Sequence, residues 1–290
     1  MGGLAAGLLH IFALAPRPVR LFMGNRFGDL ARLLVSRART VARKNLEMAF
    51  PGLSAKQRHQ MLRTHFRSLG QGLVELGPLW FWPLDQALSL IREVRGAEAV
   101  DAALAGGQGV ILFTAHLGAW EAVVQYIGQR WPVTVMYMAT RNASINTLMT
   151  TGRGRSGARL VPKEKGIRPL LEALQKGEVA GILPDQNVDP REGVFAPFFH
   201  RPACTTPLLA RLARRRQSPV FGIYAYRLPK GRGYRVEIVP MEPGFPAGDD
   251  EADAAAMNAA LETAILKAPE QYWWIHRRYK DPAPGWEYPY

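Results

Sequence analysis

Cysteine is almost absent from the chain, because Cys204 is the only one among 290 residues. A single cysteine excludes an internal disulfide framework and favours a reducing compartment. The sequence also lacks internal repeats, and its only low-complexity tract is the alanine-rich stretch at residues 251–260. Apolar residues still make up 48% of the composition, which is typical of globular proteins and excludes extended disorder. The length suits one large α/β domain or two small ones.

Acidic side chains are scarce in residues 1–70, which contain Asp29 and Glu47 against twelve Lys and Arg. Over the whole chain, 37 Lys and Arg stand against 24 Asp and Glu, which gives a net charge of +13. Such an excess attracts nucleic acid, anionic lipid or an acidic protein, and a solvated face that only maintains solubility is the alternative. No recognised nucleic-acid-binding motif is present, so we expect no nucleic-acid partner.

The apolar run at residues 4–15 is short of the roughly 20 residues that a bilayer-spanning helix needs. No basic segment precedes it and no clear cleavage site follows it, so we do not expect a secretory signal. Residues 19–34 place apolar side chains at helical spacing with arginines between them, which is typical of a helix in the membrane interface. We therefore predict that residues 1–40 form a membrane-associating helical segment. An amphipathic helix packed on the core is the alternative, and whether the segment spans or lies on the membrane is open.

Alternating strand and helix patterns begin at about residue 91. They predict an α/β fold with a mainly parallel central sheet that is flanked by helices. The expected strands are residues 109–115, 132–138, 158–161, 178–183, 220–226 and 234–239. The expected helices are residues 97–105, 119–130, 144–153, 167–176, 206–216 and 249–267.

Two local features refine this fold prediction. The last two strands are joined only by residues 229–233, which predicts an antiparallel hairpin. Before the alternating region, Ser54 is a suitable N-cap for a helix that runs to about Glu75.

One histidine and one carboxylate follow the predicted strand at residues 109–115. His116 comes at the carboxyl end of that strand, where α/β proteins place their working residues, and Glu121 follows five positions later. A neutral histidine can take a proton from a hydroxyl, and a carboxylate at its second ring nitrogen would fix the tautomer. We predict that His116 is a general base oriented by Glu121; a hydrogen-bonded structural histidine is the alternative. The other histidines lack partners at metal-ligand spacing, so we expect neither a metal nor another cofactor.

The H-x4-E pattern from His116 to Glu121 resembles the H-x4-D/E signature of glycerolipid acyltransferases. More closely, the chain is similar to the late, or secondary, lipid A acyltransferases, the lauroyl- and myristoyltransferase family. Nine blocks carry the resemblance in the family's order: residues 42–47 with 50–51, 72–75, 80–83, 116–121, 152–156, 177–179, 184–186, 194–199 and 268–280.

This resemblance implies a glycerol-3-phosphate acyltransferase-like fold, with residues 41–290 as the acyltransferase domain. It implies transfer of a fatty acyl chain from acyl-carrier protein to a hydroxyl of a lipid A precursor, at the cytoplasmic face of the inner membrane. Inner-membrane lipids are then further partners. No acyl-enzyme is required, so the lack of a G-x-S-x-G elbow is expected.

The resemblance also assigns roles outside the His-Glu pair. Arg153 would stabilise the oxyanion or hold an acceptor phosphate, and Arg155 is the second choice for that role. Asp185, which follows the predicted strand at residues 178–183, would position Arg153 or an acceptor hydroxyl.

Further residues are candidates for substrate binding. Arg141 and Asn142 fall where relatives carry a basic residue and an asparagine, although Met138 departs from the family pattern there. Thr206 and the apolar residues 195–199 would line an acyl channel. The basic side chains of residues 277–280 would meet lipid phosphates or the carrier protein, with a solvated tail as the alternative.

Two other functions remain open from the sequence. An enzyme that acylates a glycerophospholipid, an ornithine lipid or another glycolipid would carry the same His-Glu motif. A non-catalytic membrane-binding module would also carry the basic charge but would not need the motif. Neither the acyl chain length, nor the acceptor hydroxyl, nor the oligomeric state follows from these residues.

Overall fold

A central sheet of seven strands organises the computed structural model, which describes residues 2–290. The strand order is β1-β9-β8-β2-β5-β3-β4, and all neighbours are parallel except the β8–β9 hairpin. A separate antiparallel hairpin is formed by β6 and β7. The strands are β1 (Ile91–Arg95), β2 (Val110–Phe113), β3 (Val133–Tyr137), β4 (Arg159–Pro162), β5 (Val179–Ile182), β6 (Val194–Phe198), β7 (Arg201–Thr205), β8 (Val220–Arg227) and β9 (Tyr234–Pro240).

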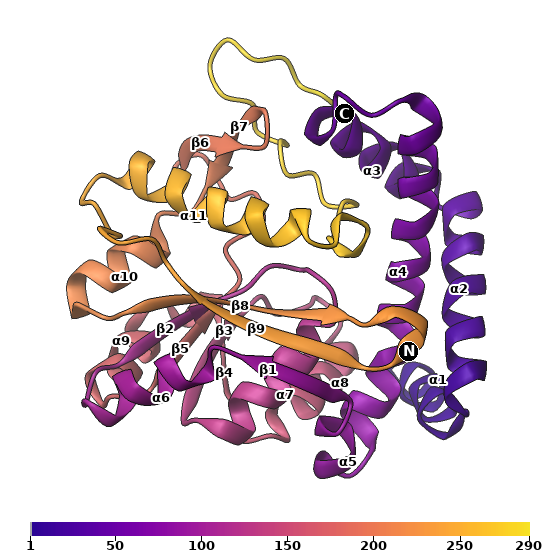
Figure 1. Cartoon of the computed structure of the whole chain (residues 1–290), viewed down its shortest axis with the longest axis horizontal. Coiled ribbons are helices and arrows are strands. Elements are labelled where there is room, and N and C mark those ends of the chain that lie inside the picture. Colours follow the sequence, from indigo (N-terminus) through magenta and orange to yellow (C-terminus); the bar gives the residue numbers. More distant parts are fainter. Residues whose placement is uncertain (1) are drawn as a thin grey trace.

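Helices cover both faces of this sheet (Figure 1). Strand β2 shows why: Val110 and Leu112 belong to one buried cluster, whereas Ile111 and Phe113 belong to the other, because successive side chains point to opposite faces. Helices α6 and α7 contribute to the first cluster, and α9, α10 and α11 to the second. The helices of this region are α5 (Leu84–Leu88), α6 (Ala97–Ala105), α7 (Trp120–Arg130), α8 (Ala143–Gly154), α9 (Arg168–Gln175), α10 (Leu208–Arg216) and α11 (Asp250–Leu266).

The mainly parallel sheet flanked by helices confirms the predicted fold class, and each predicted strand and helix lies close to its observed position. The hairpin between the last two strands is confirmed as well. Strands β1, β6 and β7 are additions that the sequence analysis did not predict.

The first four helices are α1 (Gly2–Leu14), α2 (Arg17–Leu34), α3 (Ser36–Ala49) and α4 (Ala55–Phe81). Ser54 is the N-cap of α4, and its side chain forms a capping box with Gln57. Helix α4 runs through Pro78 and ends beyond the predicted Glu75. Helices α4 and α2 stand side by side across the end of the sheet where the β8–β9 hairpin turns (Figure 1).

Glycines set the distance between α2 and α4. Gly24 and Gly28 of α2 face Gly70 of α4, and a side chain on any of the three would overlap the backbone of the other helix. The two helices therefore touch backbone to backbone, and α2 is held firmly against α4 although much of its own surface is exposed.

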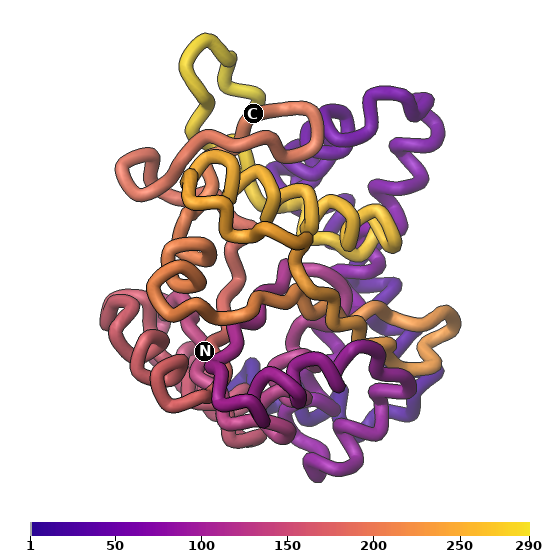
Figure 2. The backbone as a smooth tube through the Cα atoms, turned by 60° about the vertical axis from the view of Figure 1, so that its left-hand side comes forward, coloured from indigo at the N-terminus to yellow at the C-terminus, as the bar shows by residue number. Residues whose placement is uncertain are grey.

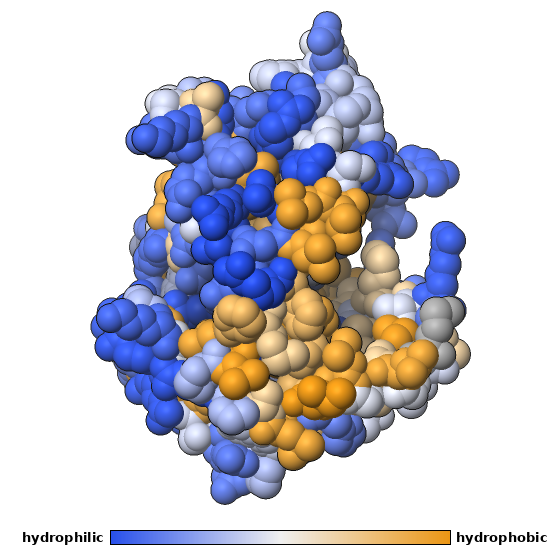
Figure 3. Space-filling view, turned by 90° about the vertical axis from the view of Figure 1, so that its right-hand side faces the viewer, coloured by the Kyte–Doolittle hydropathy of each residue, from blue (hydrophilic) through white to orange (hydrophobic). Residues whose placement is uncertain are grey.

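An apolar surface lies on the outer side of α1 and α2. We call it the apolar helix face; it consists of the exposed side chains of Leu4, Leu8, Ile11, Leu14, Val19, Phe22, Leu30, Leu33 and Leu34. Figure 3 looks onto this side of the molecule and shows hydrophobic residues gathered there beside hydrophilic ones. No helix within residues 2–290 has both the length and the apolar character that crossing a membrane requires.

The C-terminal segment returns from α11 to α3 (Figure 2). The amide of Asn45 donates to the carbonyl oxygens of Trp274 and His276, and the hydroxyl of Tyr290 donates to Asn45. Arg278 is buried in this segment and donates to the carbonyl of Cys204 and to the hydroxyl of Thr205. The expectation that Arg278 meets lipid phosphates is therefore wrong, because its guanidinium joins the C-terminal segment to β7.

Candidate active site

Strands β2 and β5 bring two predicted site residues together. The strands are parallel neighbours, and Phe113 pairs with Ile182 at their carboxyl ends. His116 and Asp185 each follow three residues after that pair, so the register alone places them side by side. The carboxyl ends of parallel strands are where α/β sheets usually place their ligands.

Asp185 holds the imidazole of His116 from behind. Its Oδ1 lies 2.9 Å from Nδ1 of His116, and its Oδ2 accepts a hydrogen bond of 2.9 Å from the backbone N–H of the same residue. We expected Glu121 at this ring nitrogen, and that geometry is wrong: Glu121 belongs to α7, whose first turn directs it towards α8.

The charge of Asp185 decides which ring nitrogen carries the proton. Asp185 is 1% exposed. Burial opposes its ionisation, but the charge of His116 and the two hydrogen bonds outweigh this effect and hold the pKa of Asp185 below its ordinary value. An ionised carboxylate only accepts hydrogen bonds, so Nδ1 carries the proton. Nε2, which has no hydrogen-bond partner within residues 2–290, is then free to accept one.

Glu121 and Arg153 form a second pair beside the histidine. Arg153 lies in the last turn of α8, and its Nε donates to Oε2 of Glu121 over 3.0 Å. Burial lowers the pKa of Arg153, but the charge and hydrogen bonds of Glu121 outweigh it and raise the pKa above its ordinary value. Hydrogen bonds engage Nε and Nη2, which leaves Nη1 without a partner among the described residues. A fixed cation whose Nη1 has free N–H groups is suited to stabilising a developing oxyanion.

His116 and Arg153 line one cavity of about 280 Å³, which we call the His116 cavity. Its remaining walls are mainly apolar and include Trp120, Val124, Val135, Met136, Met149, Leu160, Ile182 and Leu208, with Lys163, Gln186 and Asn187 among the polar residues. Leu160 is on β4, three strands from β2, so the cavity reaches about 14 Å across the sheet at the usual strand spacing. The side chain of His116 is 22% exposed. The imidazole is therefore accessible at one end of a long apolar space.

Gly118 shapes the loop that presents His116. Its φ of +61° lies in the left-handed region, and a side chain there would meet the carbonyl oxygen of Ala225. The tight turn places Trp120 against the imidazole, with ring centroids 5.5 Å apart, and Trp273 lies 6.3 Å away on another side. Neither tryptophan was among the residues predicted from the sequence to have a role.

His276 supports the loop that carries Asp185. Its Nε2 accepts a hydrogen bond of 3.0 Å from the backbone N–H of Asn187, two residues after Asp185. Burial lowers the pKa of His276 to about 4, so the ring is neutral and can serve as this acceptor. This role could not be predicted from the sequence, because His276 and Asn187 lie far apart in the chain.

The four predicted substrate-binding residues have different positions. Thr206 lines the His116 cavity. Arg155 lies outside it, because its guanidinium donates to the backbone carbonyls of Leu79 and Trp82. Asn142 is the N-cap of α8, where it accepts from the backbone N–H of Ile145, and Arg141 next to it is exposed.

The apolar residues 195–199 do not line the cavity either. They form most of β6 and its turn, and Phe198 is buried in the core beneath α11. The expectation of an acyl channel at this run is wrong, because the run has the alternating burial of a strand packed on the core.

The fold and the site together define an α/β protein with a His–Asp pair at one end of an apolar cavity and an Arg–Glu pair beside it. Such an arrangement is suited to activating a hydroxyl next to a bound hydrocarbon chain. The family model described as bacterial lipid A biosynthesis acyltransferase matches residues 3–281. The chain belongs to this family and is an acyltransferase of lipid A biosynthesis, as its sequence resemblance predicted.

Named relatives agree with this assignment. The lipid A biosynthesis palmitoleoyltransferase of Escherichia coli (strain K12) is 36% identical over 94% of this chain and 89% of its own length. The lipid A biosynthesis lauroyltransferase of the same organism is 35% identical over 97% of this chain and 92% of its own. Its lipid A biosynthesis myristoyltransferase is 27% identical over 96% and 86%.

Proposed function

We propose that this acyltransferase moves a fatty acyl chain from the thioester of acyl-carrier protein to a hydroxyl of a lipid A precursor. The observation that carries the proposal is the imidazole of His116, which is held by Asp185 at Nδ1 and opens with its free Nε2 towards the apolar His116 cavity. The names of the relatives place lauroyl, myristoyl and palmitoleoyl chains among the groups that such proteins transfer.

In the proposed reaction, Nε2 of His116 removes the proton from the acceptor hydroxyl as its oxygen attacks the thioester carbonyl. Asp185 stabilises the imidazolium that forms. Nη1 of Arg153 donates to the oxyanion of the tetrahedral intermediate, and Glu121 keeps the guanidinium in place. When the intermediate collapses, the C–S bond breaks and the carrier thiolate takes the proton back from His116. The products are the ester and the free carrier thiol.

The apolar helix face suits the surface of a membrane. Its nine exposed side chains belong to two helices that also carry Arg17, Arg26 and Arg32, and a basic amphipathic surface binds anionic lipid. We propose that residues 1–40 lie against the cytoplasmic face of the inner membrane, while residues 41–290 form the acyltransferase domain. A lipid acceptor would then reach the enzyme without leaving the bilayer.

Replacing His116 tests the proposed chemistry. The His116→Ala variant removes the general base, so transfer from acyl-carrier protein to a tetraacyl disaccharide bisphosphate should fall by about a thousandfold or more. Flotation with inner-membrane vesicles should be unchanged, because His116 is not part of the apolar helix face. Transfer by the variant at the wild-type rate would refute the role of His116. A wild-type enzyme that acylates only glycerophospholipid or ornithine lipid in a panel of acceptors would refute the proposed substrate.

A further inference from the structure

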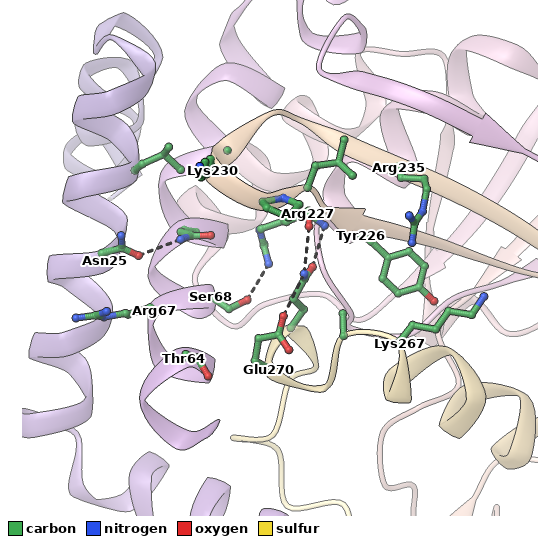
Figure 4. A pocket seen from close by; sticks show the side chains of 17 residues that line it. Asn25, Thr64, Arg67, Ser68, Tyr226, Arg227, Lys230, Arg235, Lys267 and Glu270 are labelled. Atoms are coloured by element: carbon green, nitrogen blue, oxygen red, sulfur yellow. Dashed lines mark hydrogen bonds between the residues drawn. The ribbon is translucent and has the colours of Figure 1, made fainter. Parts of the chain in front are cut away.

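A second, larger cavity lies between α2, α4 and the β8–β9 hairpin (Figure 4). Its volume is about 620 Å³, and we call it the basic cavity because Arg67, Arg227, Lys230, Arg235 and Lys267 line it against a single acidic residue, Glu270. Figure 4 shows that these cations lie on several elements, with Arg235 and Lys267 on the side opposite Arg67. Nothing in the proposed acyl-transfer step uses this cavity.

The carboxylates around the basic cavity do not balance its cations. Asp29 is shared by Arg67, Arg63 and Arg26, at distances of 2.9, 4.0 and 3.5 Å. Glu237 is likewise shared by Arg235 and Lys267.

The remaining cations extend this excess. Arg227 is paired with Glu75, whereas Lys230 has no carboxylate within 4.0 Å among the described residues. Carboxylates that are shared between cations hold these side chains in place, but the positive charges outnumber the negative ones. The cavity is therefore suited to an anion with several oxygen acceptors.

The basic cavity continues towards the loop that carries His116 and Gly118. Ser68, Arg227 and Gln271 line it and also line a smaller cavity of about 150 Å³, which we call the connecting cavity. The connecting cavity is walled by Gly118–Glu121 and by Trp273. Trp120 lines both the connecting cavity and the His116 cavity. Trp120 therefore lies between the connecting cavity and the space that contains His116.

The basic cavity also borders the proposed membrane surface. Leu21 and Asn25 of α2 line it, while Phe22 on the same helix is 62% exposed as part of the apolar helix face. Charged headgroups of lipids lie at the level of such interfacial helices. A lipid whose anionic headgroup entered the basic cavity would keep its hydrocarbon near the bilayer.

The arginines that the sequence suggested for an acceptor phosphate are already engaged. Arg153 is held by Glu121, and Arg155 donates to backbone carbonyls. Glu121 engages Nε and Nη2 of Arg153, which leaves Nη1 for substrate, and the oxyanion of the proposed reaction requires that nitrogen. A phosphate of the acceptor therefore needs other cations.

We propose that the basic cavity binds the phosphate-bearing sugar headgroup of the glycolipid acceptor. The hydroxyacyl chain of that acceptor then passes through the connecting cavity to His116, and the donor chain occupies the His116 cavity. This inference rests on the proposed function, since it assigns a binding site to the acceptor of that reaction.

The test compares two neutralised lysines. Lys230→Asn removes a cation of the basic cavity, and asparagine tolerates the positive φ of 55° at this position. Lys176→Asn is the matched control, because Lys176 is exposed at the amino end of β5, away from the site. Both variants and the wild type are assayed with a tetraacyl disaccharide bisphosphate and with the same lipid after phosphatase treatment.

The preference for the phosphorylated acceptor, expressed as a ratio of kcat/KM values, should fall about tenfold in Lys230→Asn. It should keep its wild-type value in Lys176→Asn. An unchanged preference in Lys230→Asn, or an equal fall in both variants, would overturn the assignment.

Direct binding separates this inference from the proposed function. A fluorescent disaccharide bisphosphate without acyl chains should bind the wild type, and Lys230→Asn should weaken that binding about tenfold. Inorganic phosphate or phosphatidylglycerol vesicles that displace the probe at equal phosphate concentration would show a general anion site and overturn the proposal. Because binding requires no turnover, the two ideas fail separately. A wild type that does not bind the probe refutes the site, whereas a wild type that binds the probe but transfers no acyl chain refutes the proposed function.

Discussion

The His116 cavity and the basic cavity each share lining residues with the connecting cavity, but they differ in the side chains that line them and in the elements that form them. The His116 cavity is mainly apolar and is formed at the carboxyl ends of β2, β5, β3 and β4. The basic cavity is more than twice as large and is formed where helices α2 and α4 meet the β8–β9 hairpin. A hydrocarbon fits the first, and a charged headgroup fits the second.

In the proposed reaction, chemistry and acceptor recognition are carried by separate elements. The strand register fixes His116 and Asp185, so the reacting groups depend on the core of the sheet. The cations of the basic cavity come from α4, from strands β8 and β9, from the exposed hairpin turn at Lys230, and from Lys267 after α11. Acceptor preference can therefore change through surface residues while the reacting groups stay in place. The predictions below separate the two cavities by experiment.

The largest effect is expected where the sequence and the structure give the histidine different partners. Asp185→Asn keeps the shape of the residue but removes the charge that fixes the tautomer of His116, so kcat should fall about a thousandfold. Glu121→Gln should reduce kcat less, by about tenfold to a hundredfold, because it acts through Arg153. Steady-state acyl transfer with both variants measures the difference. A greater loss in Glu121→Gln would favour the partner predicted from sequence over the one in the structure.

An intermediate effect is expected on the apolar helix face. Phe22→Glu replaces an exposed apolar side chain by a charge, so affinity for anionic vesicles should fall by about tenfold to a hundredfold. The acceptor preference for phosphate should remain, because Phe22 does not line the basic cavity. Leu266→Glu, at an exposed leucine of α11 outside this face, is the control for vesicle flotation. An equal loss of vesicle affinity in both variants would contradict the proposal that the apolar helix face binds the membrane.

The smallest effect is expected at the far wall of the His116 cavity. Leu160→Phe adds volume about 14 Å from the strand that leads to His116, so the longest acyl donor should react about tenfold more slowly and shorter donors should be preferred. Competition among saturated acyl thioesters of increasing length measures the shift. The control is Leu228→Phe, which enlarges a side chain of the basic cavity and should leave the length profile as it is. The same shift in both variants would contradict separate places for donor and acceptor.

Much of the fold followed from the sequence, because local patterns dictate it. The buried run at residues 110–113 and the alternation of strands with helices predict a parallel sheet without knowledge of contacts. Strands β6 and β7 escaped prediction because prolines at residues 197 and 202 interrupt the pattern, although both lie within the paired hairpin. Helix α4 similarly continues through Pro78, where packing against α1 and α8 overrides the local signal.

The contacts within the site were harder to predict from the sequence, because they depend on the order of the strands in the sheet. His116 and Asp185 both follow predicted strands, but their contact required β2 and β5 to be neighbours in matching register. Glu121 is closer to His116 in sequence, yet the first turn of α7 directs it to Arg153. The hydrogen bonds of Arg155 could not be predicted from sequence spacing. Their acceptors are the backbone carbonyls of Leu79 in α4 and of Trp82, which follows α4 directly.

The direct backbone contact between Gly24, Gly28 and Gly70 affects the distance between the proposed active site and the proposed membrane surface. Since α2 rests on α4 with no side chain between them, the proposed membrane surface and the sheet are joined at a fixed separation. Even one methyl group at Gly70 would push the outer helix away from its support. Three positions that carry no chemistry of their own thus govern how deep a lipid must reach to meet the imidazole.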